Sequence, residues 1–289
     1  MKKIIVILFA LLLLAGCSNA NHYSSLSDGD EVIFSGPNMT YTKNDLYKSL
    51  KVSSEDAIAS DIIDKIALKL DGIDMESINK QADELIETYQ SLGYESYIIS
   101  SYGSLDAYRK SYVSTLLLSE LSKAYVNEKF DELSVEKKPV KMQLASFANE
   151  DDAKKCIEDV NNGSTFDMAA VNNNAANAPQ SAVYTDDDTS LVYEVKDYLN
   201  STDTTGVSTI IVSTSSTQDA DGNINENNTY YVLNVESRNV ADFKDEFVDL
   251  LATTVSSDDV RNHFLSSHEI EFFDQDLYKI MTEAFEVLK

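Results

Sequence analysis

Helical periodicity dominates both ends of the chain and is lost in its middle, which limits the folds that the sequence can adopt. Apolar residues three or four positions apart predict helices at 58–70, 75–92 and 104–133, and again between 242 and 288. Gly93 is expected to end the second of these helices. Each amphipathic helix leaves an apolar stripe that needs a partner. We therefore expect the last helices to pack against the first ones.

The middle of the chain has the pattern of a small α+β domain. Pro139 disfavours a continuing helix, and residues 140–147 predict a strand. Three further helices are expected, at 151–161, over a short segment from Phe166, and at 193–199. Two strands follow, at 207–213 and 229–236, and a polar turn at 218–228 joins them. The predicted fold class is α+β, with a helical domain that is split by an inserted small α+β domain.

The first seventeen residues indicate where the chain works. Lys2 and Lys3 precede an apolar run over 4–14 that is too short to span a bilayer but suits a signal peptide. The run ends in Leu14-Ala15-Gly16-Cys17, which resembles the lipobox of bacterial lipoproteins, in which the cysteine sulfur carries a diacylglyceryl group. We predict a signal peptide over 1–16, lipid attachment at Cys17, and an extracytoplasmic protein anchored to the bacterial cell membrane.

Composition narrows the classes of partner. With 43% hydrophobic and 25% charged residues the chain is globular. Loss of two lysines with the signal peptide would take the net charge from −26 to −28, which makes nucleic acid and anionic membrane surfaces poor partners. Once Cys17 is lipidated only Cys156 remains, so no internal disulfide can form and a buried thiol is expected.

Residues that could carry other chemistry lack the rest of their motifs. The run Asp219-Ala220-Asp221-Gly222-Asn223 resembles part of a calcium loop, but Tyr230 stands where the bidentate glutamate is needed. A second acidic run, Asp186 to Asp188, and the pair His263 and His268 have no completing ligands in the sequence. We predict no metal, no cofactor and no catalytic residue.

Three segments of the helical parts are informative together: Thr42-Lys43-Asn44-Asp45-Leu46-Tyr47 as an opening helix, Asp106-Ala107-Tyr108-Arg109-Lys110 before the leucine-rich run 116–121, and Ile270-Glu271-Phe272-Phe273 as a closing strand before a helix. Together they resemble the PrsA foldase family and its periplasmic relative SurA. The resemblance implies a lipoprotein with a split helical chaperone domain. The expected divisions are signal peptide 1–16, flexible spacer 17–37, helical part 38–136, inserted domain 137–239 and helical part 240–289.

Four segments of the inserted domain are informative together: Val140-Lys141, Asn162-Gly163-Ser164-Thr165-Phe166, Gly206-Val207-Ser208 and Tyr230-Tyr231-Val232-Leu233-Asn234-Val235. With them the domain resembles a parvulin-type peptidyl-prolyl isomerase. Active parvulins carry one histidine on the first strand and one on the last; the aligned positions here are Leu144 and Tyr231. The chain's only histidines are His22, His263 and His268, all outside 137–239. We therefore interpret the isomerase site as degenerate.

Three functions are compatible with these observations. The leading one is a membrane-anchored extracytoplasmic foldase or chaperone for unfolded exported polypeptides, in which some of the many tyrosines of the helical part line a client cleft. The alternative is an active prolyl isomerase with an altered site. A solute-binding lipoprotein of a transporter is the third, but it requires repeated strand and helix alternation, which residues 40–133 do not have. A second copy of the chain is a further candidate partner.

Overall fold

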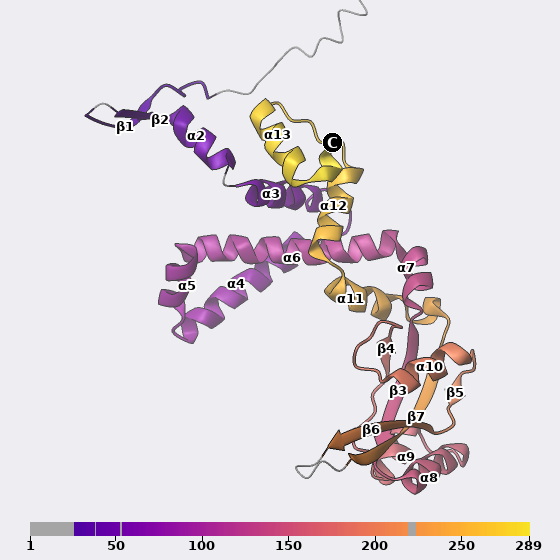
Figure 1. Ribbon diagram of the computed structural model, residues 1–289. Helices are drawn as coiled ribbons and strands as arrows, with labels where there is room; N and C mark the ends of the chain where they lie inside the picture. Colours follow the sequence, from indigo (N-terminus) through magenta and orange to yellow (C-terminus); the bar gives the residue numbers. More distant parts are fainter. Residues whose placement is uncertain (1–25, 38, 53, 219–223) are drawn as a thin grey trace, which may run out of the picture. The chain divides into compact units, whose positions relative to one another are not determined.

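The chain forms an α+β structure of two compact units, seen here in a computed structural model (Figure 1). The model describes residues 26–37, 39–52, 54–218 and 224–289. Unit 1 combines the residues up to Leu121 with Ser256–Lys289, and unit 2 is Ser122–Val255. The predicted signal peptide, Cys17 and His22 lie outside the described residues.

The described part of unit 1 is helical except for one hairpin. Its elements are β1 (Val32–Gly36), β2 (Met39–Thr42), α2 (Lys43–Val52), α3 (Glu55–Ala67), α4 (Met75–Ser91), α5 (Glu95–Tyr102), the first part of α6 (Leu105–Glu128), α12 (Ser257–Ser267), α13 (Gln275–Ala284) and the 3-10 turn η2 (Glu286–Leu288). The periodicity of the sequence thus predicts α3, α4, α6, α12 and α13, but it misses α5.

Helix α4 starts and ends at residues whose chemistry favours those positions. The Asp74 carboxylate accepts a hydrogen bond from the Ser77 backbone N–H, 3.0 Å away, and so caps the first turn. At the other end Gly93 has φ +78°, a left-handed conformation that glycine adopts without a Cβ clash. The Tyr94 N–H then donates to the Tyr89 carbonyl. The prediction that Gly93 ends this helix is confirmed.

The core of unit 1 joins segments from both ends of the chain. Helix α3 contacts both α12 and α13. Ile63 and Ala67 of α3 are buried, as are Phe264 of α12 and Met281 of α13. The expectation that the last helices pack against the first ones is therefore confirmed. The buried face of α3 contains Ala59 and Ile63 rather than the Ile58 and Ile62 that the sequence pattern indicated.

A buried ion pair also links the two ends. The Lys51 ammonium lies 3.0 Å from the Asp274 carboxylate, and both side chains are less than a tenth exposed. Asp274 also accepts hydrogen bonds from the Tyr47 hydroxyl and from the Leu277 N–H, the latter capping α13. Burial is the largest single influence on the pKa of Asp274 and raises it, but the hydrogen bonds and Lys51 together outweigh burial and hold that pKa below its usual value.

The hairpin of β1 and β2 differs from the expected spacer. The two strands pair antiparallel, and the Phe34 and Tyr41 rings stack with centroids 4.8 Å apart. Lys43 bridges Asp28 and Glu31 beside it. The expectation of a flexible segment up to residue 37 is wrong from Val32 onward. The sequence pattern did not indicate this strand, because its short run of strand-forming side chains lies among polar residues.

Unit 2 is built around an antiparallel sheet. Its elements after α6 are α7 (Phe130–Lys137), β3 (Val140–Phe147), α8 (Glu150–Asn161), α9 (Phe166–Asn172), β4 (Ala182–Tyr184), α10 (Tyr193–Ser201), β5 (Gly206–Val207), β6 (Ile211–Gln218), β7 (Ile224–Ser237), the 3-10 turn η1 (Val240–Phe243) and α11 (Lys244–Thr254). The strands follow the order β4-β3-β7-β5, and β6 pairs with the outer part of β7.

The two faces of this sheet pack against different helices. Ala145, Phe147 and Val232 point to one face, where they meet Cys156 of α8 and Phe166 of α9. The alternating residues of the same strands point to the other face and pack with α10; they are Val140, Met142, Leu144, Tyr231, Leu233 and Val235. This alternation follows from the two-residue period of a strand. The central strands are consequently covered on both faces.

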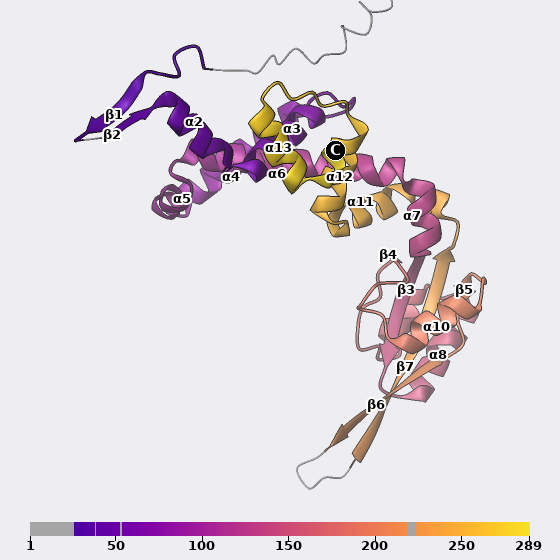
Figure 2. The same cartoon turned by 45° about the horizontal axis from the view of Figure 1, so that its top comes forward.

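Three local predictions differ from the structure. Strands β6 and β7 continue to Gln218 and from Ile224, so most of the expected turn at 218–228 is an extended hairpin that projects beyond the sheet (Figure 2). The expected helix 104–133 is divided at Lys129 into α6 and α7. Residues 270–273 form no strand, since none of the described strands of unit 1 pairs with them.

The limits of unit 2 lie outside the 137–239 that the sequence suggests for the inserted domain. A third buried cluster explains the difference. Val126 at the end of α6 and Leu133 of α7 pack with Phe243, Phe247 and Leu251 of η1 and α11. These helices accordingly belong with the sheet rather than with the remaining helices.

Replacing Asp274 with asparagine should lower the free energy of unfolding by about 3 kcal/mol, because the buried Lys51 ammonium loses its counter-charge while asparagine can still cap α13. Since folding lowers the pKa of Asp274, its contribution is complete above the unfolded pKa and is lost as the pH falls through the folded one. The difference between the two proteins should therefore shrink in acid. Urea unfolding followed by far-ultraviolet circular dichroism at several pH values measures it.

The matched control is Asp276→Asn. Asp276 lies 3.3 Å from the same ammonium, but its side chain is 74% exposed. Its removal should cost less than about 1 kcal/mol. Equal losses from the two substitutions would contradict a dominant role for the buried pair.

Candidate functional site

Five tyrosines line an open recess of about 720 Å³ in unit 1. Tyr89 comes from α4 and Tyr108 from α6, and the others belong to α5 and the turn before it; the remaining lining residues are Tyr94, Tyr97, Ile98, Ser101 and Tyr102. Tyr97 is 71% exposed and Tyr94 is 51% exposed. The sequence predicted that tyrosines gather in the helical part, but it did not indicate Ile98 or Ser101.

The geometry of the recess follows from two glycine turns. Gly93 separates α4 from α5, and Gly103, with φ +83°, separates α5 from α6. The chain therefore changes direction at both glycines, and one side of the short α5 lines the recess together with Tyr89 of α4 and Tyr108 of α6. Residues 94, 97, 98 and 102 share that side because they are three or four positions apart. A hydrogen bond from the Ala107 N–H to the Ser104 hydroxyl caps the start of α6.

Ring contacts hold the tyrosines in place. Edge-to-face pairs join Tyr102 to Tyr108, with centroids 4.7 Å apart, and Tyr89 to Tyr108, 5.9 Å apart. Burial and a hydrogen bond with Tyr89 raise the pKa of Tyr108 to about 12, so its phenol stays neutral at physiological pH. Neutral, amphipathic rings of this kind suit contact with apolar segments of a polypeptide.

The two residues that the sequence resemblance places at the parvulin histidine positions lie on adjacent strands. Leu144 is on β3 and Tyr231 on β7, and both are half-buried against the cluster that α10 covers. They are not direct partners, because Leu144 pairs with Leu233 and Tyr231 pairs with Ser146. The side chains around them on this face are mainly aliphatic, including Met142 and Val195.

The other residues that the sequence singled out are held by contacts within the fold. Cys156 is fully buried, so the prediction of a buried thiol is confirmed, and burial raises the pKa of this thiol to about 11. Asp187 is held by the Thr185 hydroxyl and by Lys137. His268 lies beside the Phe264 carbonyl. Within the described ranges no cluster of three potential metal ligands occurs, and residues Asp219 to Asn223 lie outside them.

Comparisons with known proteins give one sequence match and several structural ones. Residues 1–18 match the family model described as the prokaryotic membrane lipoprotein lipid attachment site. No curated protein matches the chain. The chain is similar to the solved structure of foldase protein PrsA from Streptococcus pneumoniae, with 19% identity, a TM-score of 0.44, and coverage of 87% of this chain and 98% of that one.

It is also similar to the peptidylprolyl isomerase (PrsA) of Bacillus cereus, with 17% identity, a TM-score of 0.46, and coverage of 88% and 98%. A third similar structure is PrsA from Bacillus subtilis, with 16% identity, a TM-score of 0.36, and coverage of 88% and 99%.

The match to the lipid attachment site indicates where in the cell the protein is located. It covers the whole predicted signal peptide together with the cysteine that follows it. Over the part of the chain that the structure describes, no helix is long and apolar enough to cross a bilayer. The match makes the chain a lipid-anchored protein on the extracytoplasmic side of the membrane.

Proposed function

We propose that this chain is a membrane-anchored extracytoplasmic foldase of the PrsA type, whose helical unit binds unfolded exported polypeptides. The observation that carries the proposal is the tyrosine recess, which offers exposed aromatic edges in an open hollow instead of an enclosed small-molecule site. Aromatic side chains give a large contact area at a low cost in conformational entropy. Binding through them is tolerant of sequence, as a chaperone for many clients requires.

In this proposal unit 2 contains a parvulin-like domain that has lost catalysis. Its order of one strand, two helices, a short strand, a helix and returning strands supports the likeness, as do the sequence segments that resemble parvulins. Isomerisation requires groups that stabilise the twisted amide more than the planar one. Leu144 and Tyr231 lie on a mainly aliphatic face, and no histidine occurs between residues 122 and 255.

Cys17 is proposed as the lipid attachment residue. Replacing it with serine removes the sulfur that would accept the diacylglyceryl group, so the variant should fail to incorporate labelled fatty acid and should leave the membrane fraction or remain unprocessed. Metabolic labelling with a radioactive fatty acid, followed by membrane fractionation, measures both. Cys156→Ser is the control and should be labelled like the unmodified chain; labelling of the Cys17→Ser variant would disprove this assignment.

The client-binding role predicts a specific defect in a double variant, Tyr94→Ser with Tyr97→Ser. Both side chains are about half exposed or more, so their loss should leave the fold intact while it removes two aromatic anchors. About ten times more of the variant should be needed for the same suppression of aggregation when a denatured protein is diluted. Light scattering measures the effect.

The matched control is Tyr193→Ser. Tyr193 is 77% exposed but belongs to α10 of unit 2, away from the residues that line the recess. This variant should suppress aggregation as well as the unmodified chain. An equal loss in both variants, or no suppression by the unmodified chain, would overturn the proposal.

The degenerate-site interpretation predicts no acceleration of prolyl isomerisation. In a protease-coupled assay on a short proline-containing peptide, the mature chain should give the rate of the uncatalysed reaction, which takes tens to hundreds of seconds. An active parvulin measured in parallel shows that the assay works. A rate well above background would establish the alternative, an isomerase with an altered site.

A further inference from the structure

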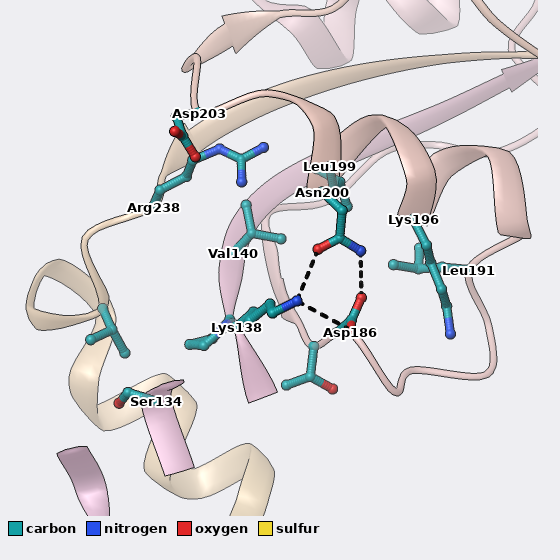
Figure 3. A pocket seen from close by; sticks show the side chains of 13 residues that line it. Ser134, Lys138, Val140, Asp186, Leu191, Lys196, Leu199, Asn200, Asp203 and Arg238 are labelled. Carbon is teal, nitrogen blue, oxygen red and sulfur yellow. Dashed lines mark hydrogen bonds and ion pairs between the residues drawn. The ribbon is translucent and has the colours of Figure 1, made fainter. Parts of the chain in front are cut away.

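A second, smaller pocket of about 370 Å³ lies at one end of the sheet in unit 2. One wall is apolar and includes Val140 and Leu199. Three basic side chains line it, Lys138, Lys196 and Arg238, and Figure 3 shows Lys138 and Arg238 on either side of Val140. The pocket therefore combines an apolar surface with positively charged side chains, although the chain as a whole is strongly acidic.

Arg238 has a buried nitrogen that lacks an acceptor. Among the residues that the structure describes, its Nη2 atom is buried without a hydrogen-bond partner, and its Nε donates to the Thr204 carbonyl at a long 3.4 Å. Leaving a buried charged donor unpaired costs more than a hydrogen bond contributes, so such a group calls for an acceptor that the chain itself does not supply. A guanidinium is planar and pairs best with a carboxylate or a phosphate.

The neighbouring polar groups leave this guanidinium to an external ligand. Asn200 donates to Asp186 at 2.8 Å and accepts from Lys138 at 3.4 Å, so these three side chains satisfy one another (Figure 3). Asp203 lies beside the stem of Arg238 in Figure 3, yet among the described residues no ion pair within 4.0 Å joins Arg238 to a carboxylate.

We propose that this pocket binds a carboxylate that carries an aliphatic group, the chemistry of the last residue of a polypeptide with a free carboxyl terminus. The orphaned guanidinium would pair with the carboxylate, and the side chain would lie on the wall that includes Val140 and Leu199. Asp186 and Asp203 also line the pocket, and their charges disfavour a dianion such as phosphate. A volume of about 370 Å³ is at the small end of ligand pockets, which suits a single residue.

The inference goes beyond the foldase role and does not depend on it. It concerns the sheet-containing unit alone, and it can be tested without any folding assay. If the aggregation assay fails, the pocket can still bind its ligand, and if the pocket is empty, the tyrosine recess can still bind clients.

Arginine side-chain nuclear magnetic resonance gives a direct test. The chain has three arginines, Arg109, Arg238 and Arg261, so three Nε–H signals report on the full mature protein. Adding N-acetyl-leucine should shift the Arg238 signal and leave Arg109, which binds Asp83, and Arg261 unchanged. N-acetyl-leucinamide, which lacks the charge, should shift none of them at the same concentration.

Two substitutions should act in opposite directions. Arg238→Gln should weaken N-acetyl-leucine binding about tenfold or more, followed through the methyl signals of Val140 and Leu199. Asp203→Asn should strengthen binding, because it removes a negative charge from the pocket. Arg261→Gln is the control for a general change in net charge and should leave the affinity unchanged.

Either of two results would overturn the proposal. An equal effect of the acid and the amide would mean that water satisfies Arg238 and that no carboxylate is recognised. Inorganic phosphate that shifts the Arg238 signal as strongly as N-acetyl-leucine would mean that the pocket takes any anion. The Asp203→Asn variant keeps the test valid even if Arg238→Gln unfolds.

Discussion

The ion pair between Lys51 and Asp274 joins parts of the chain that are 223 residues apart in sequence. Two charges can remain in a nearly dry setting only if each has a partner and the other lone pairs are satisfied, and here Tyr47 and the Leu277 N–H supply the remaining bonds. The pair thus fixes α2 against the start of α13. Because α3 also packs with α12 and α13, both charged and apolar contacts join the first and last helices of unit 1.

This closure explains why the middle of the chain can be a separate unit. The entropic cost of closing a loop grows only with the logarithm of its length, so an insertion adds little once the ends are held. Unit 2 has buried clusters of its own on both faces of the sheet and among the flanking helices. It can therefore carry different chemistry, and the two pockets differ accordingly: aromatic and open in unit 1, mixed and basic in unit 2.

The sequence predicted what depends on neighbours along the chain. Spacing indicated α4, Gly93 ended it as expected, and Pro139 marked the start of β3. It failed where contacts between distant residues decide, as in the pairing of β1 with β2 and the rotation of α3 toward Ile63. The tyrosines could be foreseen as a group, but Arg238 could not, because a lone arginine has no spacing signal and its missing acceptor exists only in the folded unit.

If unit 2 is a parvulin-like domain, as we propose, the absence of histidine between residues 122 and 255 has a physical consequence for the proposed foldase. A face formed by Leu144, Tyr231 and aliphatic neighbours can bury apolar surface, but it has few groups that would favour a rotated amide over a planar one. Contact with a planar peptide bond would then contribute to binding affinity but would not accelerate prolyl isomerisation. In a chain that the lipid keeps near the membrane, binding alone is useful, because a held segment cannot aggregate with its neighbours. The open tyrosine recess is suited to such holding in the proposed foldase.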